Sequence, residues 1–408
     1  MSDGTKRSGK ENTRFARNYA REMVVFTHGT GVHLFDKDGN RYLDFGSGIA
    51  VNALGHGDAE LAEAVYDQMR KVVHVSNLFT TPPALALAEE LLEMSRGAGR
   101  NDFQAVQFGN SGAEANEAAI KYARLTSLAE RGAGHFRILS FENAFHGRTM
   151  GSLSATPQKK YQEKFEPLVP GFGTVPFNDP EALDRLLDDT VAALLVEVVQ
   201  GEGGLAVMSP ETAEAINRIT AERGIILVAD EIQTGLGRTG TLFASTQVGL
   251  KPDIITLSKP LAGGLPLSAT LIPARVNEKL SPGDHGTTFG GGPVTAAAAR
   301  VVLSRLRSSE LLDHVATVAA VLEEGLSEML REVDAVKELR GMGLLRGLVL
   351  DFGDRTDTRF PEVMEEARQH GLIVLRSGTN VLRIAPPLII SGEEIRTGLS
   401  ILREVLEG

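Results

Sequence analysis

The sequence predicts an α/β fold, with a large domain built on a mostly parallel sheet and a smaller α+β domain. Three observations support this. The chain has 408 residues, more than one ordinary hydrophobic core accommodates. The segments 191–199 and 224–230 are almost entirely apolar, as in strands buried on both faces of a parallel sheet. Strand-like and helix-like segments also alternate through the middle of the chain.

The first part of the chain is expected to contribute to both domains. We expect residues 1–18 to form a disordered tail and 19–60 to form the N-terminal segment of the small domain. Within 28–45, a Lys-Asp-Gly-Asn tract separates two alternating segments, which predicts a β-hairpin. Residues 61–292 are expected to form the large domain, with a helix at 113–124. Its predicted strands cover 102–108, 135–141, 191–199, 224–230, 252–258 and 267–272.

The pattern changes after residue 292, and we expect 293–408 to form the small α+β domain. Long amphipathic helices are predicted at 294–307 and 310–333. In the second helix one face carries Leu311, Val315, Val318, Leu322 and Leu326. Two strands, 344–350 and 381–385, flank a helix that we expect to start at Pro361 and end at Gly371.

Composition excludes several classes of protein. The formal net charge is −11 and no basic cluster is visible, so we expect no nucleic-acid partner. The absence of cysteine excludes disulfides, thiolate metal sites and a cysteine nucleophile, and we expect no metal. The polar N-terminus does not resemble a secretory signal, and no apolar run reaches the roughly 18 residues that span a bilayer. We therefore expect a cytoplasmic protein with no membrane partner.

Chemically useful residues lie directly after three of the predicted strands, where ligands bind in open α/β sheets. A Gly-rich turn at 109–113 opens a helix, and its free N–H groups can bind an anion. Asp230 ends a buried strand, and Lys259 comes after another, where desolvation would lower its pKa and favour Schiff-base formation. Each feature alone is also explained by a helix cap, a turn cap or a snorkelling lysine. Together they match the phosphate, pyridine nitrogen and aldehyde of pyridoxal phosphate (PLP).

Seven segments in order carry a family resemblance. The chain resembles the class III (omega-amino acid) aminotransferases, most closely the N-acetylornithine aminotransferases, from about Tyr19 onward. The segments are FGNSGAEANEAAIKYAR (108–124), AFHGRTMGSLSAT (144–156), VEVVQGEGG (196–204), LVADEIQTGLGRTG (227–240), LSKPLAGGLPLSA (257–269), HGTTFGGGP (285–293) and LRIAPPL (382–388). One position departs from the family pattern: Val198 stands where a proline is usual.

The resemblance implies fold type I of the PLP-dependent transferases, with a seven-stranded sheet, and it assigns the cofactor site. Lys259 would hold the cofactor covalently and Asp230 would pair with its pyridine nitrogen. Thr288 would reach the phosphate from a neighbouring subunit, which implies a homodimer. The remaining cofactor residues would be Ser111, Gly112 and Ala113 at the phosphate, Phe145 and His146 at the ring, and Gln233 near the phenolic oxygen.

The resemblance also assigns the substrate residues. Arg383 would bind the α-carboxylate of glutamate or 2-oxoglutarate, and Glu202 would pair with Arg383 when the ω-amino substrate is bound. Arg148 would bind the other substrate carboxylate through its planar fork. Glu197 and Tyr19 would lie near the amino-donor site.

The implied reaction is a ping-pong transfer from an amino donor to 2-oxoglutarate, in which Lys259 moves a proton. Ile49 stands where ornithine-using relatives carry a tyrosine, and an apolar residue there suits an acylated nitrogen. This favours N-acetylornithine as donor and a place in arginine synthesis. Succinylornithine, succinyldiaminopimelate, acetyl-lysine, ornithine and 4-aminobutyrate remain alternatives, as do an aminomutase and a non-catalytic PLP-binding protein.

Overall fold

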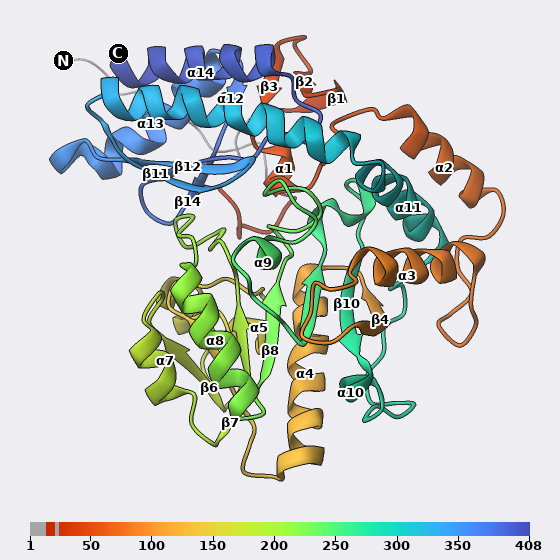
Figure 1. The fold of residues 1–408 in the computed structure, drawn as a ribbon. Coiled ribbons are helices and arrows are strands. Elements are labelled where there is room, and N and C mark those ends of the chain that lie inside the picture. Colours follow the sequence, from red (N-terminus) through yellow and green to blue (C-terminus); the bar gives the residue numbers. More distant parts are fainter. Residues whose placement is uncertain (1–13, 21–23) are drawn as a thin grey trace.

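A seven-stranded sheet forms the centre of the computed structural model, which describes residues 14–20 and 24–408 (Figure 1). The strand order is β4-β10-β9-β8-β7-β5-β6, and β10 alone runs antiparallel to its neighbours. The strands are β4 (Phe103–Gly109), β5 (Arg137–Phe141), β6 (Phe172–Val175), β7 (Val191–Val196), β8 (Ile226–Asp230), β9 (Ile254–Leu257) and β10 (Ser268–Pro273). The predicted mostly parallel seven-stranded sheet is confirmed.

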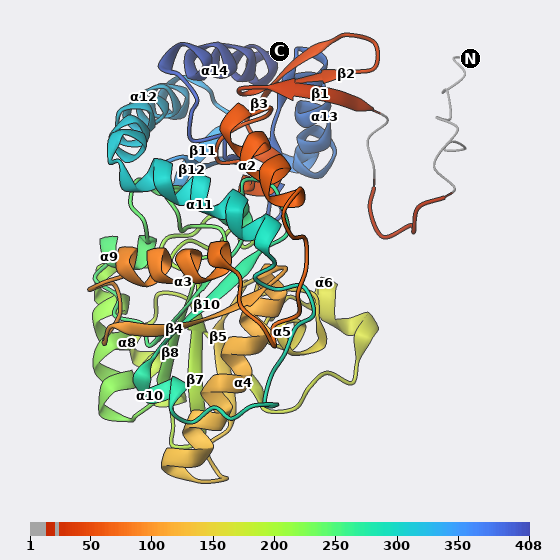
Figure 2. The same cartoon turned by 90° about the vertical axis from the view of Figure 1, so that its right-hand side faces the viewer.

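Helices cover both faces of this sheet because its central strands are apolar on both sides. Every residue of β7, β8 and β9 is buried. Along β7, Leu195 packs in the cluster that contains α4, whereas Leu194 packs in the cluster that contains α8. Figure 2 shows α4 (Gly112–Arg131) and α8 (Pro210–Glu222) on opposite sides of the sheet. The other helices near the sheet are α3 (Pro82–Met94), α5 (Met150–Ser154), α6 (Lys159–Gln162), α7 (Pro180–Leu186), α9 (Ala244–Gln247) and α10 (Ala274–Asn277), with the 3-10 turns η1 (Glu163–Phe165) and η2 (Lys259–Ala262).

Two four-stranded sheets form the rest of the molecule. One is antiparallel, in the order β11-β12-β15-β14. The other, β1-β2-β3-β13, joins distant parts of the chain because β13 pairs in parallel with β3. The strands are β1 (Phe26–Thr30), β2 (His33–Asp36), β3 (Arg41–Asp44), β11 (Val336–Met342), β12 (Leu345–Leu350), β13 (Leu372–Ile373), β14 (Leu375–Ser377) and β15 (Val381–Ile384). The helices are α1 (Ser47–Ala50), α2 (Ala59–Met69), α11 (Pro293–Arg307), α12 (Glu310–Glu332), α13 (Thr356–Gln369) and α14 (Gly392–Glu407), with the 3-10 turn η3 (Gly353–Arg355).

One predicted helix start is wrong. Helix α13 begins at Thr356, and Pro361 lies inside it. A proline inside a helix removes a backbone hydrogen bond and disfavours helical backbone at the residue before it. That residue is Phe360, which is fully buried. Burial of its ring offsets the cost of continuing the helix toward the N-terminus.

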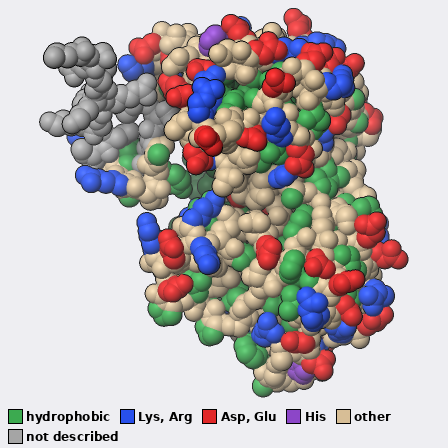
Figure 3. All heavy atoms as spheres, turned by 90° about the vertical axis from the view of Figure 1, so that its left-hand side faces the viewer, with side chains coloured by type: hydrophobic (Ala, Val, Ile, Leu, Met, Phe, Trp, Pro, Cys, Tyr) green, Lys and Arg blue, Asp and Glu red, His purple; other side chains and the backbone are tan. Residues whose placement is uncertain are grey.

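The predicted domain limits at 60/61 and 292/293 stay a prediction. Much of the expected tail, 1–13, lies outside the described residues, as do 21–23. Helix α11 packs on both α2 and α3, so the start of the predicted segment 293–408 contacts the first helices of the predicted large domain. Among the described helices, none is long and apolar enough to cross a membrane. On the face drawn in Figure 3, acidic and basic side chains are interspersed.

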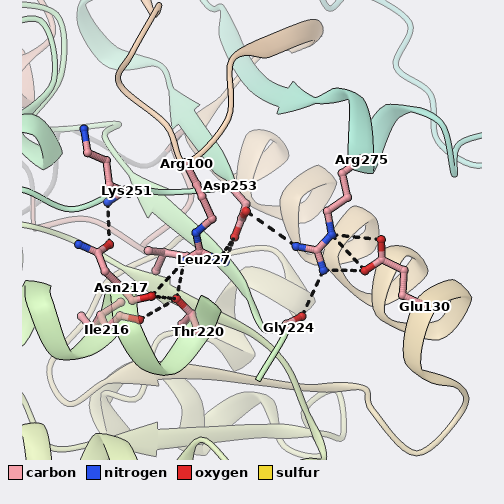
Figure 4. Close-up of polar contacts among 10 residues, drawn as sticks. All are labelled: Arg100, Glu130, Ile216, Asn217, Thr220, Gly224, Leu227, Lys251, Asp253 and Arg275. Carbon is pink, nitrogen blue, oxygen red and sulfur yellow. Dashed lines mark hydrogen bonds and ion pairs between the residues drawn. The ribbon is translucent and has the colours of Figure 1, made fainter. Parts of the chain in front are cut away.

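A buried ion network closes the end of the large sheet that lies away from Asp230 (Figure 4). The Asp253 carboxylate, just before β9, is fully buried and accepts a hydrogen bond from the Leu227 backbone N–H at 2.9 Å. Its oxygens lie 3.5 Å from an Arg100 nitrogen and 3.9 Å from an Arg275 nitrogen. Arg275 also forms a forked contact with Glu130 on α4. This network ties the α3–β4 loop, α4 and α10 to the sheet.

We expect Asp253→Ala to lower the free energy of unfolding by about 3 kcal/mol, because it leaves two partly buried guanidinium groups and a buried N–H without their shared acceptor. Asp253→Asn should cost less, since its amide oxygen can still accept from Leu227. Urea denaturation measures both losses, with Asp67→Ala on the exposed part of α2 as the control. Equal stability of Asp253→Ala and the control would contradict this role for the network.

Candidate functional site

Asp230, the last residue of β8, is the central acid of the site. It is 5% exposed. One carboxylate oxygen contacts His146 Nδ1 at 2.8 Å and accepts from Asn116 Nδ2 at 2.8 Å. The other accepts from the Ile232 backbone N–H at 3.1 Å. These contacts fix the orientation of the carboxylate.

Asn116 was missed by the sequence analysis. It projects from α4 and is fully buried. Its amide nitrogen donates to the His146 carbonyl at 2.8 Å as well as to Asp230, and its oxygen accepts from Thr256 on β9 at 2.9 Å. The available signal was an amide among alanines on the buried face of a predicted helix, since a buried amide needs several partners.

Lys259 comes after β9 and begins the 3-10 turn η2. Its φ of +30° lies in the left-handed region, which is unfavourable for a residue with a side chain. Burial lowers the pKa of the Lys259 amine, and the Asp230 carboxylate is the largest influence in the opposite direction. The amine is therefore desolvated while Asp230 acts on it electrostatically, and desolvation favours the neutral amine that reacts with an aldehyde.

The N-terminus of α4 borders the same region. Ser111 is the N-cap, and its hydroxyl accepts from Glu114 N. Gly112 lies against the loop after β8: a Cβ there would stand 2.8 Å from Ile232 Cδ1. Gly112 therefore brings the helix start and the Asp230 strand end together. Ala113 is next in the first turn, where free N–H groups can bind an anion.

Glu197 connects two loops of the site. Its carboxylate accepts from Phe145 N at 3.0 Å and from Gly201 N at 3.2 Å. Burial raises the pKa of Glu197 to about 7, against the influence of His146. Both oxygens thus bind backbone groups, which orients the Phe145 loop against the turn that carries Glu202.

Arg383 on β15 brings the antiparallel sheet into the site. Its Nη1 lies 2.5 Å from a Glu202 oxygen, 3.1 Å from Gln233 Oε1 and 3.0 Å from the Gly201 carbonyl oxygen. Arg383 is buried and its Nε has no partner among the described residues. Because a buried arginine needs an anion, the Glu202 carboxylate balances its charge in this arrangement.

Three other predicted residues lie nearer the surface. The Arg148 guanidinium stacks over the ring of Tyr161 at 3.8 Å and is 5.4 Å from the Phe145 ring centre. Tyr19 is exposed. Thr288 is exposed and lines a hollow together with Asn110 and Phe289.

The structure therefore brings together a desolvated amine, a fixed acid, a helix N-terminus and an arginine whose charge is balanced by a side chain. Such a set can bind a phosphorylated aldehyde, keep a ring nitrogen protonated and bind a carboxylate substrate.

The chain is similar to known proteins over most of its length. Residues 14–406 match the family Aminotransferase class-III. The chain is 44% identical to the acetylornithine aminotransferase of Gloeobacter violaceus, over 95% of this chain and 94% of that protein. The solved N-acetylornithine aminotransferase of Stenotrophomonas maltophilia is 36% identical, with a TM-score of 0.82, over 95% of this chain and 97% of that one. The ornithine aminotransferase of Toxoplasma gondii is 31% identical, with a TM-score of 0.90, over 97% of this chain and 92% of that one.

The lowered pKa of Lys259 predicts its reactivity. In protein freed of bound aldehydes with hydroxylamine, acetic anhydride should label Lys259 at a lower pH than it labels exposed Lys337, because only the neutral amine reacts. Asp230→Asn should move the labelling midpoint of Lys259 lower still, since it removes the charge that raises this pKa. Peptide mass spectrometry measures both midpoints. An upward shift in Asp230→Asn would contradict the electrostatic coupling.

Proposed function

The chain belongs to the class III aminotransferases, and we propose that it transfers the ω-amino group of N-acetylornithine to 2-oxoglutarate. The products are N-acetylglutamate 5-semialdehyde and glutamate, which makes this a step of arginine biosynthesis. The observation that carries the proposal is the Glu202–Arg383 pair beside Lys259 and Asp230, because it can accept donors both without and with a carboxylate at the reacting carbon.

Pyridoxal phosphate is the cofactor of this family, and the residues of the site fit it. Lys259 would hold its aldehyde, Asp230 its pyridine nitrogen, and the first turn of α4 with Ser111, Gly112 and Ala113 its phosphate. When bound, the cofactor supplies an electron sink for the carbon that loses a proton. The buried Asp230 carboxylate, fixed by His146, fits this role since it favours a protonated ring nitrogen.

The amine of Lys259 would move the proton. Its lowered pKa makes the neutral amine more available as a base, and the same nitrogen can return the proton as an acid. Phe145 and Gln233 would position the ring, with Phe145 held through its backbone by Glu197.

Arg383 and Glu202 would let one site accept two donors. N-acetylornithine has no carboxylate at its reacting carbon, so the closed pair leaves no unpaired buried cation. Glutamate and 2-oxoglutarate bring a carboxylate that replaces Glu202 at Arg383. Arg148 would bind the distal carboxylate of either substrate through the N–H groups at the edge of its guanidinium, while the face of the group stacks on Tyr161.

Two observations support an acylated donor: the apolar side chain of Ile49, and the similarity of the chain to proteins named acetylornithine aminotransferase. Ile49 is 47% exposed, so its apolar side chain is available to a ligand. An uncharged, acylated nitrogen loses less hydration against such a surface than the ammonium of ornithine does. The ornithine aminotransferase likeness keeps free ornithine as the main competing donor.

We also propose a homodimer. Three large apolar side chains, Leu78, Phe79 and Phe289, are 87%, 70% and 66% exposed. Phe79 and Phe289 line a hollow with Thr288. A second copy covering this surface would bury these side chains and bring Thr288 toward a neighbouring phosphate site.

The substrate proposal is tested with a panel of donors under single-turnover conditions. N-acetylornithine should change the absorbance of the bound cofactor at least about ten-fold more efficiently than ornithine, 4-aminobutyrate or acetyl-lysine. A ten-fold difference corresponds to about 1.4 kcal/mol of transition-state binding. Succinylornithine belongs in the panel because it shares the acylated nitrogen. Faster reaction of ornithine would refute the proposed substrate.

The dimer is tested by Phe289→Glu, which places a charge on the proposed contact surface. We expect the wild type to sediment as a dimer and this variant to shift toward monomer, because a desolvated unpaired carboxylate opposes association. Leu330→Glu, on an exposed position of α12, is the control. A monomeric wild type would contradict the proposal.

A further inference from the structure

The turn that carries Glu202 is fastened at both ends by one buried hydroxyl. Ser377, the last residue of β14, is 1% exposed. Its Oγ donates to the Gly201 carbonyl at 2.7 Å and accepts from the Gly204 backbone N–H at 2.9 Å. These two backbone groups flank Glu202, so the hydroxyl closes the turn behind it.

Two further bonds attach the turn to the same sheet. The Gly378 N–H donates to the Glu202 carbonyl at 3.2 Å, and Arg340 Nη1 on β11 donates to the Gly204 carbonyl at 3.3 Å. Arg340 lies on the sheet that also carries Arg383, and Gly378 directly follows Ser377, the residue of β14 that pairs with Val381 on β15. One sheet therefore holds the backbone of the acidic turn and the guanidinium that Glu202 contacts.

The other side of the turn is equally confined. The Gly201 carbonyl accepts from Arg383 Nη1 as well as from Ser377. A Cβ at Gly201 would stand 2.1 Å from Gln233 Nε2, so the backbone cannot move toward the large sheet without displacing Gln233. The side chain of Glu202 is part-exposed, in contrast to the backbone that carries it.

We propose that Ser377 is a positioning residue for the Glu202–Arg383 pair and that it sets the preference between donors without and with a carboxylate at the reacting carbon. It keeps the backbone of the turn fixed, so that the pair opens and closes by rotation of the Glu202 side chain alone. This inference rests on the proposed aminotransferase function and names a residue that controls its specificity.

The expected effect is asymmetric between the two donors. Without the hydroxyl, the Gly201 carbonyl and the Gly204 N–H lose a buried partner and the turn gains freedom. The closed pair then becomes less populated, which exposes Arg383 as an uncompensated cation toward an ω-amine. Glutamate brings its own carboxylate to Arg383, so its reaction does not need the closed pair.

The test compares Ser377→Ala with two controls. Ser377→Thr keeps the hydroxyl, and Ser95→Ala removes a fully buried serine hydroxyl that bonds within its own helix end, to the Leu92 carbonyl. Each half-reaction is monitored separately by cofactor absorbance. Ser377→Ala should lower kcat/KM for N-acetylornithine about ten-fold and for glutamate less than about three-fold, as expected for the loss of a buried hydrogen bond. Ser377→Thr should retain most of the wild-type ratio, and Ser95→Ala should leave the ratio unchanged.

Two measurements extend the test beyond this variant and beyond activity. Arg340→Met removes a different bond to the same turn and should change the ratio in the same direction by a smaller factor, even if Ser377→Ala does not fold. Calorimetric binding of glutarate, a dicarboxylate that cannot react, should be as tight or tighter in Ser377→Ala than in the wild type, because the pair opens more easily.

Equal losses in both half-reactions, a Ser377→Thr variant that behaves like Ser377→Ala, or weaker glutarate binding would overturn the positioning role. Failure of the proposed substrate is distinguishable. If the wild type reacts with glutamate but not with N-acetylornithine, the donor assignment fails, and the ratio is then measured with whichever ω-amine of the donor panel reacts, alongside glutarate binding.

Discussion

The electrostatic interaction between Asp230 and Lys259 is the constraint on which the site depends. Both groups lie at the ends of apolar strands, and each would be costly to bury alone. Strands β8 and β9 run parallel, with Asp230 opposite Thr256. Lys259 lies three residues after Thr256, so the register of the two strands sets its distance from Asp230. Asn116 makes this register specific, because its amide bonds Asp230 on β8 and Thr256 on β9 at once. A shift of either strand along the other would break the bond between Asn116 and that strand and would change the separation of Asp230 and Lys259.

A second charge pair joins the large sheet to the small antiparallel one. Arg383 comes from β15, whereas Glu202 lies on the turn after β7 and Gln233 on the loop after β8. The site therefore lies where two independently built sheets meet. Fully buried Arg238 supports the same junction, since its Nη1 donates to the carbonyls of Leu344 and Pro386 near β12 and β15. The positions of the charges depend on how these sheets dock as well as on either sheet alone.

The strand-end residues could be predicted from sequence because a buried parallel strand is recognisable from its apolar run, and the residues directly after such a strand must lie at the sheet edge. That reasoning found Asp230 and Lys259, and the family resemblance added Glu202 and Arg383, which the structure places 2.5 Å apart. Asn116 and Ser377 could not be found this way. Each acts through a hydrogen bond to a residue far away in the sequence. Asn116 is 114 residues from Asp230, and Ser377 is 176 residues from Gly201, so no local sequence pattern indicates these contacts. The helix start predicted at Pro361 was wrong for the opposite reason. Proline is a strong local signal for a helix start, but here the helix continues before it, where Phe360 is buried.

Charge balance explains why so polar a site can be buried and still accept two kinds of donor. Lys259 and Arg383 bring two basic groups, while Asp230 and Glu202 bring two carboxylates. Glu197 is a third acid, but burial raises its pKa to about 7, so near neutral pH it carries only part of a full negative charge. When a substrate carboxylate reaches Arg383, it replaces the charge of Glu202, whose part-exposed side chain can turn toward water. The buried region thus exchanges one anion for another, and the free-energy difference between donors depends on how firmly the turn under Glu202 is held.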